Sequence, residues 1–523
     1  MDHTLATEGV ITLVFLLITT MVVAVASKYI RIPYTVALTI TGLLIALANV
    51  GLSITLTPDL ILFIFLPTLL FESSYNLRFA DVRDNLRPIT LLAIPGVILT
   101  AVCVAAGLHY ATGLGWETAF LFGAIMSATD PVSVLAIFRK IGAPRRLSVI
   151  LEGESLFNDG TSIVVFRIVL GIIAASTLAN PLTTVVQFAV VVMGAVLLGA
   201  AIGYLVSAVI SRINDYLVET TATLVLAYGT YLLAEQIGVS GVIAVVVAAL
   251  VVGNYGRGGM SPTTREAVSS TWEFFAFLAN SLIFLLIGLE LNVGLLWQYL
   301  VPTLVAIGIV LAVRVVVVLL SSTVLRYIHR PIPLSWRAVL VWGGLRGSIA
   351  LALALSIPMT LVGSQPFPDR DLLLTATFGV ILFSLLVQGL TMSPILSRLG
   401  LIDKKSAQEE YEILAARKSM ALAATQEIER MGRSSGLPQE TANKLKASYA
   451  ERVAQLDDLL HELRLRDEDL SQSQNRSIRR RLLQLEKAVV RQRNLDGAIS
   501  DEPMRSLLSE IDEQIHALDD AEA

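Results

Sequence analysis

The chain has 523 residues, of which 54% are hydrophobic and 16% are charged, and its formal net charge is −4. Soluble domains carry about 25% charged residues, so this composition, with a mean hydropathy of +0.70, excludes an ordinary soluble protein and indicates a polytopic membrane protein. A single cysteine, five scattered histidines and the lack of Walker, Rossmann or nucleic-acid motifs predict no disulfide framework, no cofactor, no ATP-driven transport and no nucleic-acid partner.

Apolar runs long enough to cross about 30 Å of hydrocarbon predict thirteen transmembrane helices. The expected spans are 8–27, 34–50, 58–75, 88–110, 117–139, 147–174, 182–211, 216–236, 240–256, 266–290, 296–327, 335–358 and 371–398. Only Gly238–Gly241 separates the eighth span from the ninth. Acidic Asp2 and Glu8 replace the positive start of a signal peptide, so we interpret the first span as a helix whose N-terminus lies outside.

The loop charges alternate as thirteen spans require. One set of loops carries Lys28, Arg31, Arg78, Arg83, Arg87, Arg139, Lys140, Arg145, Arg146, Arg212, Arg257, Arg265, Arg326, Arg330, Arg337 and Arg398. The opposite set carries only Arg370 as a basic residue. Because cytoplasmic loops are enriched in Lys and Arg, the hydrophilic tail is expected in the cytoplasm.

Thirteen spans divide into two six-helix units joined by a single linking helix. Six is even, so the two units would be inverted relative to each other, as in many secondary transporters that place their sites at matching helix breaks. The fifth helix of the first unit contains Ser127–Pro131, and the fifth helix of the second contains Trp342–Ser348. We expect both helices to be broken at these points.

The charged sequence after residue 403 predicts soluble helices over Ala407–Met431 and Gln439–Leu470, separated by the breaker Gly432–Pro438. Leucines recur at helical spacing at positions 456, 459, 460 and 463. We therefore divide the chain into a transmembrane domain, residues 1–403, and a cytoplasmic helical tail, residues 404–523, that packs on itself. A regulatory or dimer-stabilising role for the tail is left open.

The sixth span contains three acids: Glu152, Glu154 and Asp159. A carboxylate near the middle of a membrane helix costs roughly 2.5–3.5 kcal/mol, so each needs a partner, a proton or an ion. Asp159 shares a helix face with Ser155, and Asn158 lies on the stripe of Glu154. A buried carboxyl can hold either a proton or a cation. Asp159 is thus the candidate exchanging group, with Ser155 and Asn158 positioning it.

Thr129-Asp130-Pro131 is the second half of the expected site. Pro131 removes an amide hydrogen and disfavours helical geometry at Asp130, so carbonyl oxygens become free beside the Asp130 carboxylate and Thr129. Hard cations prefer oxygen ligands, so Asp130 and Asp159 are predicted to bind the transported cation. Glu72, near the end of the third span, is either a third ligand or an interface acid.

An arginine in a glycine-broken membrane helix also needs an acid. We expect Arg346 to form a structural ion pair with Glu154, which would hold the sixth span to the twelfth; Glu152 could replace Glu154. The sequence assigns no partner to Arg167 or Arg314. The spacing of Gly194, Gly199 and Gly203 predicts close packing of the seventh span.

Three motifs, Ala128–Pro131, Glu152–Asp159 and Gly343–Gly347, resemble the signatures of the monovalent cation:proton antiporters, a family that includes NhaP-type prokaryotic antiporters and animal sodium/proton exchangers. The resemblance implies a homodimer whose protomers each have a dimerisation domain and a core domain with crossed, broken helices. It implies the roles given above for Asp159 and its neighbours and for the Glu154–Arg346 pair. Asn158-Asp159 resembles the electroneutral branch, one cation for one proton.

We therefore predict a secondary active Na⁺/H⁺ antiporter rather than an enzyme, in which Na⁺ or Li⁺ competes with H⁺ for Asp159 by alternating access. K⁺/H⁺ exchange is the nearest alternative, because oxygen ligands alone do not fix cation size. A cation channel and an intramembrane aspartyl protease are further alternatives, although a protease leaves the paired helix breaks unexplained. The expected location is the lipid bilayer of a bacterial plasma membrane, with a role in pH homeostasis.

Overall fold

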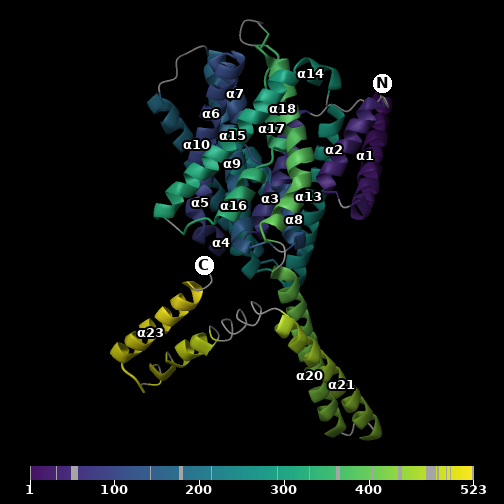
Figure 1. The fold of residues 1–523 in the computed structure, drawn as a ribbon, viewed down its shortest axis with the longest axis vertical. Helices are drawn as coiled ribbons and strands as arrows, with labels where there is room; N and C mark the ends of the chain where they lie inside the picture. The colour runs from purple at the N-terminus through teal and green to yellow at the C-terminus, as the bar shows by residue number, and fades with distance from the viewer. Residues whose placement is uncertain are drawn as a thin grey trace. The chain divides into compact units, whose positions relative to one another are not determined.

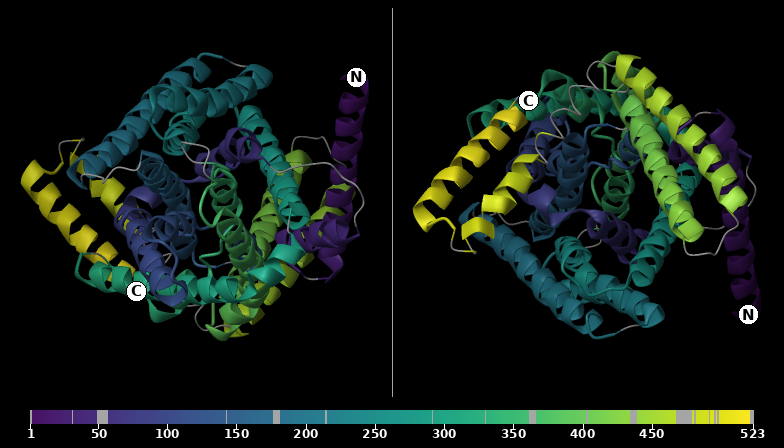
Figure 2. Two further views of the ribbon diagram at one scale, coloured as in Figure 1. Left: turned by 90° about the horizontal axis from the view of Figure 1, so that it is seen from above. Right: turned by 90° about the horizontal axis from the view of Figure 1, so that it is seen from below.

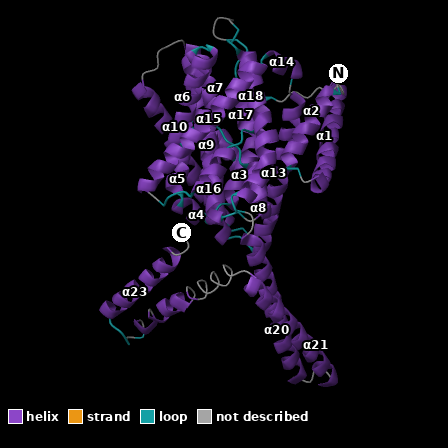
Figure 3. Cartoon of the chain, in the orientation of Figure 1, coloured by secondary structure: helices purple, strands orange, loops and turns teal. Residues whose placement is uncertain are grey.

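The computed structural model describes the chain except for residues 1, 31, 49–56, 142, 176–180, 214, 291, 329, 361–365, 402–403, 434–438, 467–478, 480–481, 491, 495, 497 and 521–523. Apart from an isolated bridge between Thr360 and Pro366, the regular elements of the described part are helices (Figure 3). The predicted all-α fold class is confirmed.

The chain forms two compact units, Met1–Leu401 and Ile402–Ala523. The predicted boundary between residues 403 and 404 lies close to this division. The orientation of the tail and the implied homodimer stay predictions.

The first half of the larger unit contains broken and continuous helices in the predicted order. They are α1 (Asp2–Ile30), α2 (Tyr34–Leu47), the π-helix η1 (Leu60–Phe65) continuing into α3 (Leu66–Asn76), α4 (Phe79–Asp84), α5 (Leu86–Ala93), α6 (Pro95–Thr112), α7 (Trp116–Ile125), α8 (Val132–Ile141) and α9 (Arg145–Ala175). Helix α9 lies inside the bundle, packed on α5, α7 and α12 (Figure 1). Helix α1 lies at its edge, against α2 and α13 (Figure 2).

The second half follows the same scheme. Its elements are α10 (Pro181–Ile210), α11 (Tyr216–Ile237), α12 (Gly241–Asn254), the short η2 (Gly256–Gly258), α13 (Pro262–Glu290), α14 (Val293–Gln298), α15 (Leu300–Ile328), α16 (Leu334–Trp342), α17 (Ser348–Leu355), α18 (Arg370–Phe383), the π-helix η3 (Ser384–Gly389) and α19 (Leu390–Arg398). Gly238 ends α11 with φ of 82°, and the Ser240 hydroxyl caps α12 by accepting from the Ile243 amide. The eighth and ninth predicted spans are therefore separate helices.

Apolar surface covers the outside of this unit. Seven of the described helices are long and apolar enough to cross a membrane, and each predicted span contains a helix. On α10, Leu182, Val190 and Leu197 are more than half exposed, which suits lipid contact and not water. The unit is membrane-embedded, while the count of thirteen crossings stays a prediction.

The helices of the two halves exchange packing partners. The second span, α2, packs on the tenth, α13, and the third span, α3, packs on the ninth, α12. Both crossings use glycine: a Cβ at Gly42 would overlap the Leu285 carbonyl, and a Cβ at Gly253 would overlap the Tyr75 carbonyl. This reciprocal pairing supports the predicted internal repeat. Close packing of α10 is also confirmed, because Gly199 and Gly203 face the α12 backbone.

The smaller unit is helical. Helices α20 (Lys404–Arg433) and α21 (Gln439–Arg466) pack together, and α23 (Asp501–Asp520) follows later in the chain. Leu414, Ala421, Leu456 and Leu460 form the buried seam between α20 and α21. The tail therefore packs on itself as predicted; residues 434–438 of its breaker lie outside the described part.

Candidate cation and proton site

Pro131 interrupts the fifth span between α7 and α8. Helix α7 ends at Ile125 and α8 begins at Val132, and the Asp130 amide donates to the Leu345 carbonyl at 2.8 Å. The Asp130 carboxylate accepts from the Val132 amide at 3.0 Å and from the Ser348 amide. Asp130 thus caps the N-termini of α8 and α17, where helix dipoles favour negative charge.

The second break lies between α16 and α17, opposite the first. Gly347 allows this approach, because a Cβ there would overlap the Asp130 side chain. The π-helix η3 satisfies the freed backbone groups: the Ser384 hydroxyl accepts from the Arg346 amide at 3.2 Å, and Gln388 donates to the Trp342 carbonyl at 3.2 Å. Both side chains are buried. Neither residue was predicted, although two polar residues in an apolar span are a signal for such a role.

Helix α9 is bound to the first break through Thr129. The Ser155 hydroxyl donates to the Thr129 carbonyl at 2.5 Å. The Asn158 amide nitrogen donates to the Thr129 hydroxyl at 2.6 Å, and the Asn158 amide oxygen accepts from the Thr129 amide at 3.4 Å. These three bonds fix the opened backbone beside the carboxylates of Asp130 and Asp159.

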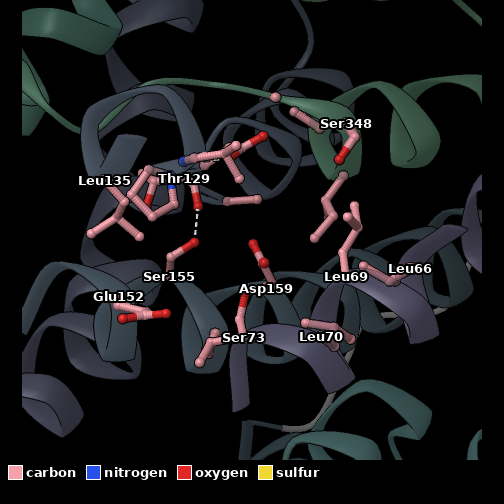
Figure 4. Close-up of a pocket in the computed structure, with 18 residues that line it drawn as sticks. Leu66, Leu69, Leu70, Ser73, Thr129, Leu135, Glu152, Ser155, Asp159 and Ser348 are labelled. Atoms are coloured by element: carbon pink, nitrogen blue, oxygen red, sulfur yellow. Dashed lines mark hydrogen bonds between the residues drawn. The ribbon is translucent and has the colours of Figure 1, made fainter. Parts of the chain in front are cut away.

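Asp159 lies in a cavity of about 60 Å³ formed where α3, α9 and the two breaks meet. Figure 4 shows its carboxylate in the middle of the cavity, with Thr129 and Ser155 on one side and Ser348 on the other. The residue is 7% exposed, and among the described residues no hydrogen-bond donor or cation binds its carboxylate. The volume holds a few water molecules or a small cation.

Comparison with known proteins decides the family. The profile described as "Sodium/hydrogen exchanger, transmembrane" matches residues 13–398. The chain belongs to the sodium/hydrogen exchanger family. This confirms the family that the three motifs predicted.

Individual relatives of this exchanger family member are consistent with that assignment. The Na⁺/H⁺ antiporter ApNhaP of Aphanothece halophytica is 44% identical over 76% of this chain and 75% of that protein. The Na⁺/H⁺ antiporter NhaS2 of Synechocystis sp. is 33% identical over 97% of this chain and 93% of its own length. The fold resembles that of the sodium proton antiporter MjNhaP1 from Methanocaldococcus jannaschii, with a TM-score of 0.62 at 20% identity over 76% of this chain and all of that one.

The structure of this family member brings five predicted site residues together: Thr129, Asp130, Ser155, Asn158 and Asp159. Glu72 is not among the residues that line the cavity; its neighbour Ser73 is. The Asn76 side chain donates to the Glu72 carboxylate at 3.2 Å. The choice between a third cation ligand and an interface acid stays a prediction. Glu152, the alternative partner expected for Arg346, does line the cavity.

The predicted partner of Glu154 is wrong. Arg314 of α15 donates to both Glu154 carboxylate oxygens, at 2.5 and 3.2 Å, and both side chains are at least nine-tenths buried. Gly344 provides the space, because a Cβ there would meet the Arg314 guanidinium. Arg346 instead donates to the Gly344 carbonyl at 2.7 Å and interacts with Glu154 only at longer range.

Arg167, the other arginine left unassigned, pairs with Glu235 of α11 at 2.9 Å. This contact joins α11 to the part of α9 that follows Asp159. Glu235 also accepts from the Gly241 amide at 3.4 Å, so the pair lies at the turn between α11 and α12.

Proposed function

We propose that this chain exchanges Na⁺, or Li⁺, for H⁺ by binding either ion at Asp159 in an alternating-access cycle. The observation that carries the proposal is the Asp159 carboxylate, buried in a cavity between two broken helices with no fixed cation or hydrogen-bond donor in the described part of the chain. Such a group stays in an apolar site only if a proton or a cation neutralises it.

Oxygen atoms suited to a dehydrated Na⁺ surround this carboxylate. The Thr129 carbonyl and the Ser155 hydroxyl lie on the cavity wall, next to Asp130. Because one carboxylate cannot hold a proton and bind Na⁺ fully at the same time, the two ions compete. This competition is the minimum chemistry of exchange. The Na⁺/H⁺ antiporters named among the relatives support Na⁺ as the cation.

Asp130 accounts for a stoichiometry of one cation per proton. Its single negative charge lies between the N-termini of α8 and α17, each equivalent to roughly +0.5 elementary charge. Asp130 is therefore compensated by the fold, and the charge of Asp159 alone changes during the cycle. The exchange would then be electroneutral. We place it in a bacterial plasma membrane, where it would serve pH homeostasis.

Everted vesicles containing the protein and a pH-sensitive dye test this function. After acidification, added Na⁺ or Li⁺ should release protons and dequench the dye, and clamping the membrane potential at zero should leave the rate unchanged. An equal or larger response to K⁺ would reassign the cation. Ion conductance without obligatory proton movement would replace the exchanger with a channel.

Glu152 should attract cations to the cavity. It lies two turns before Asp159 on α9, about 10 Å along the helix, where one charge changes the local cation free energy by about 0.4–1.6 kcal/mol. Glu152→Gln should therefore raise the KM for Na⁺ roughly two- to fifteen-fold with kcat unchanged, and the effect should shrink at high ionic strength. Glu72→Gln, the same change at a residue that does not line the cavity, should leave the KM for Na⁺ unchanged. The reverse result would restore Glu72 as the cation ligand.

A further inference from the structure

A second cavity, of about 520 Å³, lies at the start of α9, away from the exchange site. It is formed by α4, the Asn85 link that follows α4, the start of α9 and the segment between α15 and α16. Its lining is mostly charged or polar: Asp81, Asp84, Asn85, Arg145, Arg146 and Arg330. The volume falls within the roughly 300–1,000 Å³ of small-molecule pockets.

Each acid of this cavity has an arginine as a neighbour. Asp81 pairs with Arg145 at 2.5 Å, and Asp84 lies 3.6 Å from Arg83. Arg146 and Arg330 have no acidic partner within the described residues, yet they lie close enough to repel each other. The charged residues that line the cavity therefore carry one net positive charge, and Arg146 and Arg330 are the two cations that lack an acidic partner within the described residues.

Arg146 is held in a fixed position. It donates to the buried Asn85 side chain at 3.1 Å and to the Arg330 carbonyl at 3.4 Å, and its guanidinium lies 5.8 Å from the centre of the Trp336 ring. A planar guanidinium with its position set in advance suits a phosphate group, which accepts two parallel hydrogen bonds.

Helix α9 begins at Arg145, so Arg145 and Arg146 lie in its first turn. A helix N-terminus favours negative charge, and cations there are unfavourable by typically 0.3–1 kcal/mol each in exposed helices. Asp81 compensates Arg145, so Arg146 is the first-turn cation that an anion bound beside Arg330 would compensate.

We propose that this cavity binds a phosphate-bearing anion, either the headgroup of an anionic phospholipid or a soluble phosphate. Exposed apolar residues border it: Leu86 is 48% exposed and Ile328 49%, and Arg87 donates to the Ile328 carbonyl at 2.6 Å. This border places the cavity where headgroups meet acyl chains. Arg146 and Arg330 supply the hydrogen bonds to the phosphate.

Arg330→Gln tests the proposal, because the Arg330 side chain makes no hydrogen bond or ion pair within the described part and its loss should leave the fold intact. Delipidated protein in non-ionic detergent is titrated with phosphatidylglycerol or with inorganic phosphate, and bound ligand is counted by native mass spectrometry. The variant should bind about tenfold more weakly, the loss expected for one charge-assisted hydrogen bond. Arg330→Lys should recover part of the affinity.

Arg326→Gln is the matched control, since it removes an exposed arginine of α15 outside the cavity and should bind like the wild type. Dependence on Arg330 for phosphatidylglycerol identifies a lipid site, and dependence for inorganic phosphate identifies a soluble anion. If neither ligand distinguishes Arg330→Gln from Arg326→Gln, the proposal is wrong. The measurement is binding, so the outcome does not depend on the exchange activity.

Discussion

Asp159→Asn is expected to reduce Na⁺-driven proton movement to the background of empty vesicles. Asparagine keeps the size and polarity of the side chain but can neither take up a proton nor neutralise Na⁺, so both halves of the exchange fail. In the wild type, acidification should raise the KM for Na⁺ without changing the maximal rate, by up to about tenfold per pH unit once the site is mostly protonated.

Two controls accompany this variant. Its thermal unfolding in detergent should match that of the wild type, while the stabilisation by added Na⁺ should be lost, because the ion no longer binds the native state. Asp371→Asn removes an exposed carboxylate in the first turn of α18 and should exchange normally. Normal exchange by Asp159→Asn would overturn the proposed mechanism while leaving the fold assignment untouched.

The Glu154–Arg314 pair should give the largest effect on stability. Removing one partner of a buried ion pair leaves an uncompensated charge and typically costs about 3–5 kcal/mol. Glu154→Leu and Arg314→Leu should each lower the unfolding temperature strongly, as measured by a fluorescence-detected thermal scan. The double variant should be more stable than either single one, because no unpaired charge remains.

A double-mutant cycle separates this pair from the one that the sequence predicted. Glu154 should couple strongly to Arg314 and weakly to Arg346; the opposite order would restore the predicted pairing. Arg167 and Glu235 provide a comparison, with side chains 48% and 19% exposed. Breaking that pair should cost only about 1 kcal/mol or less, as for solvent-exposed pairs.

The grouping of the candidate site residues could be predicted because the bilayer makes polar residues informative. Asp159, Asp130 and Pro131 would each be unremarkable in a soluble protein, but each carries a cost or a geometric requirement inside an apolar span. The helix breaks followed from Pro131 and from the glycines of Gly343–Gly347. Local chemistry thus indicated which residues the fold brings together around the candidate site.

The ion-pair partner of Glu154 could not be predicted, because it depends on how each helix is rotated about its axis. Arg346 was expected to pair with Glu154 and Arg314 had no assigned partner, because no local rule sets which face of α15 turns inward. Glu72 and Ser73 differ by about 100° around α3. The π-helix η1 before α3 adds a residue to one turn, which rotates the following helix by a similar angle.

The glycine crossings have a mechanical consequence. At Gly42 and Gly288, and again at Gly253, peptide backbones lie against each other with no side chain between them. Side chains can change rotamer as helices slide, but two touching backbones have no such freedom. Helices α2, α3, α12 and α13, joined further by contacts between α3 and α13, should behave as a stiff frame. In the proposed alternating-access cycle, the displacement that opens the Asp159 cavity to the other side is therefore expected at the edge of this frame, where α9 and the broken helices pack against it.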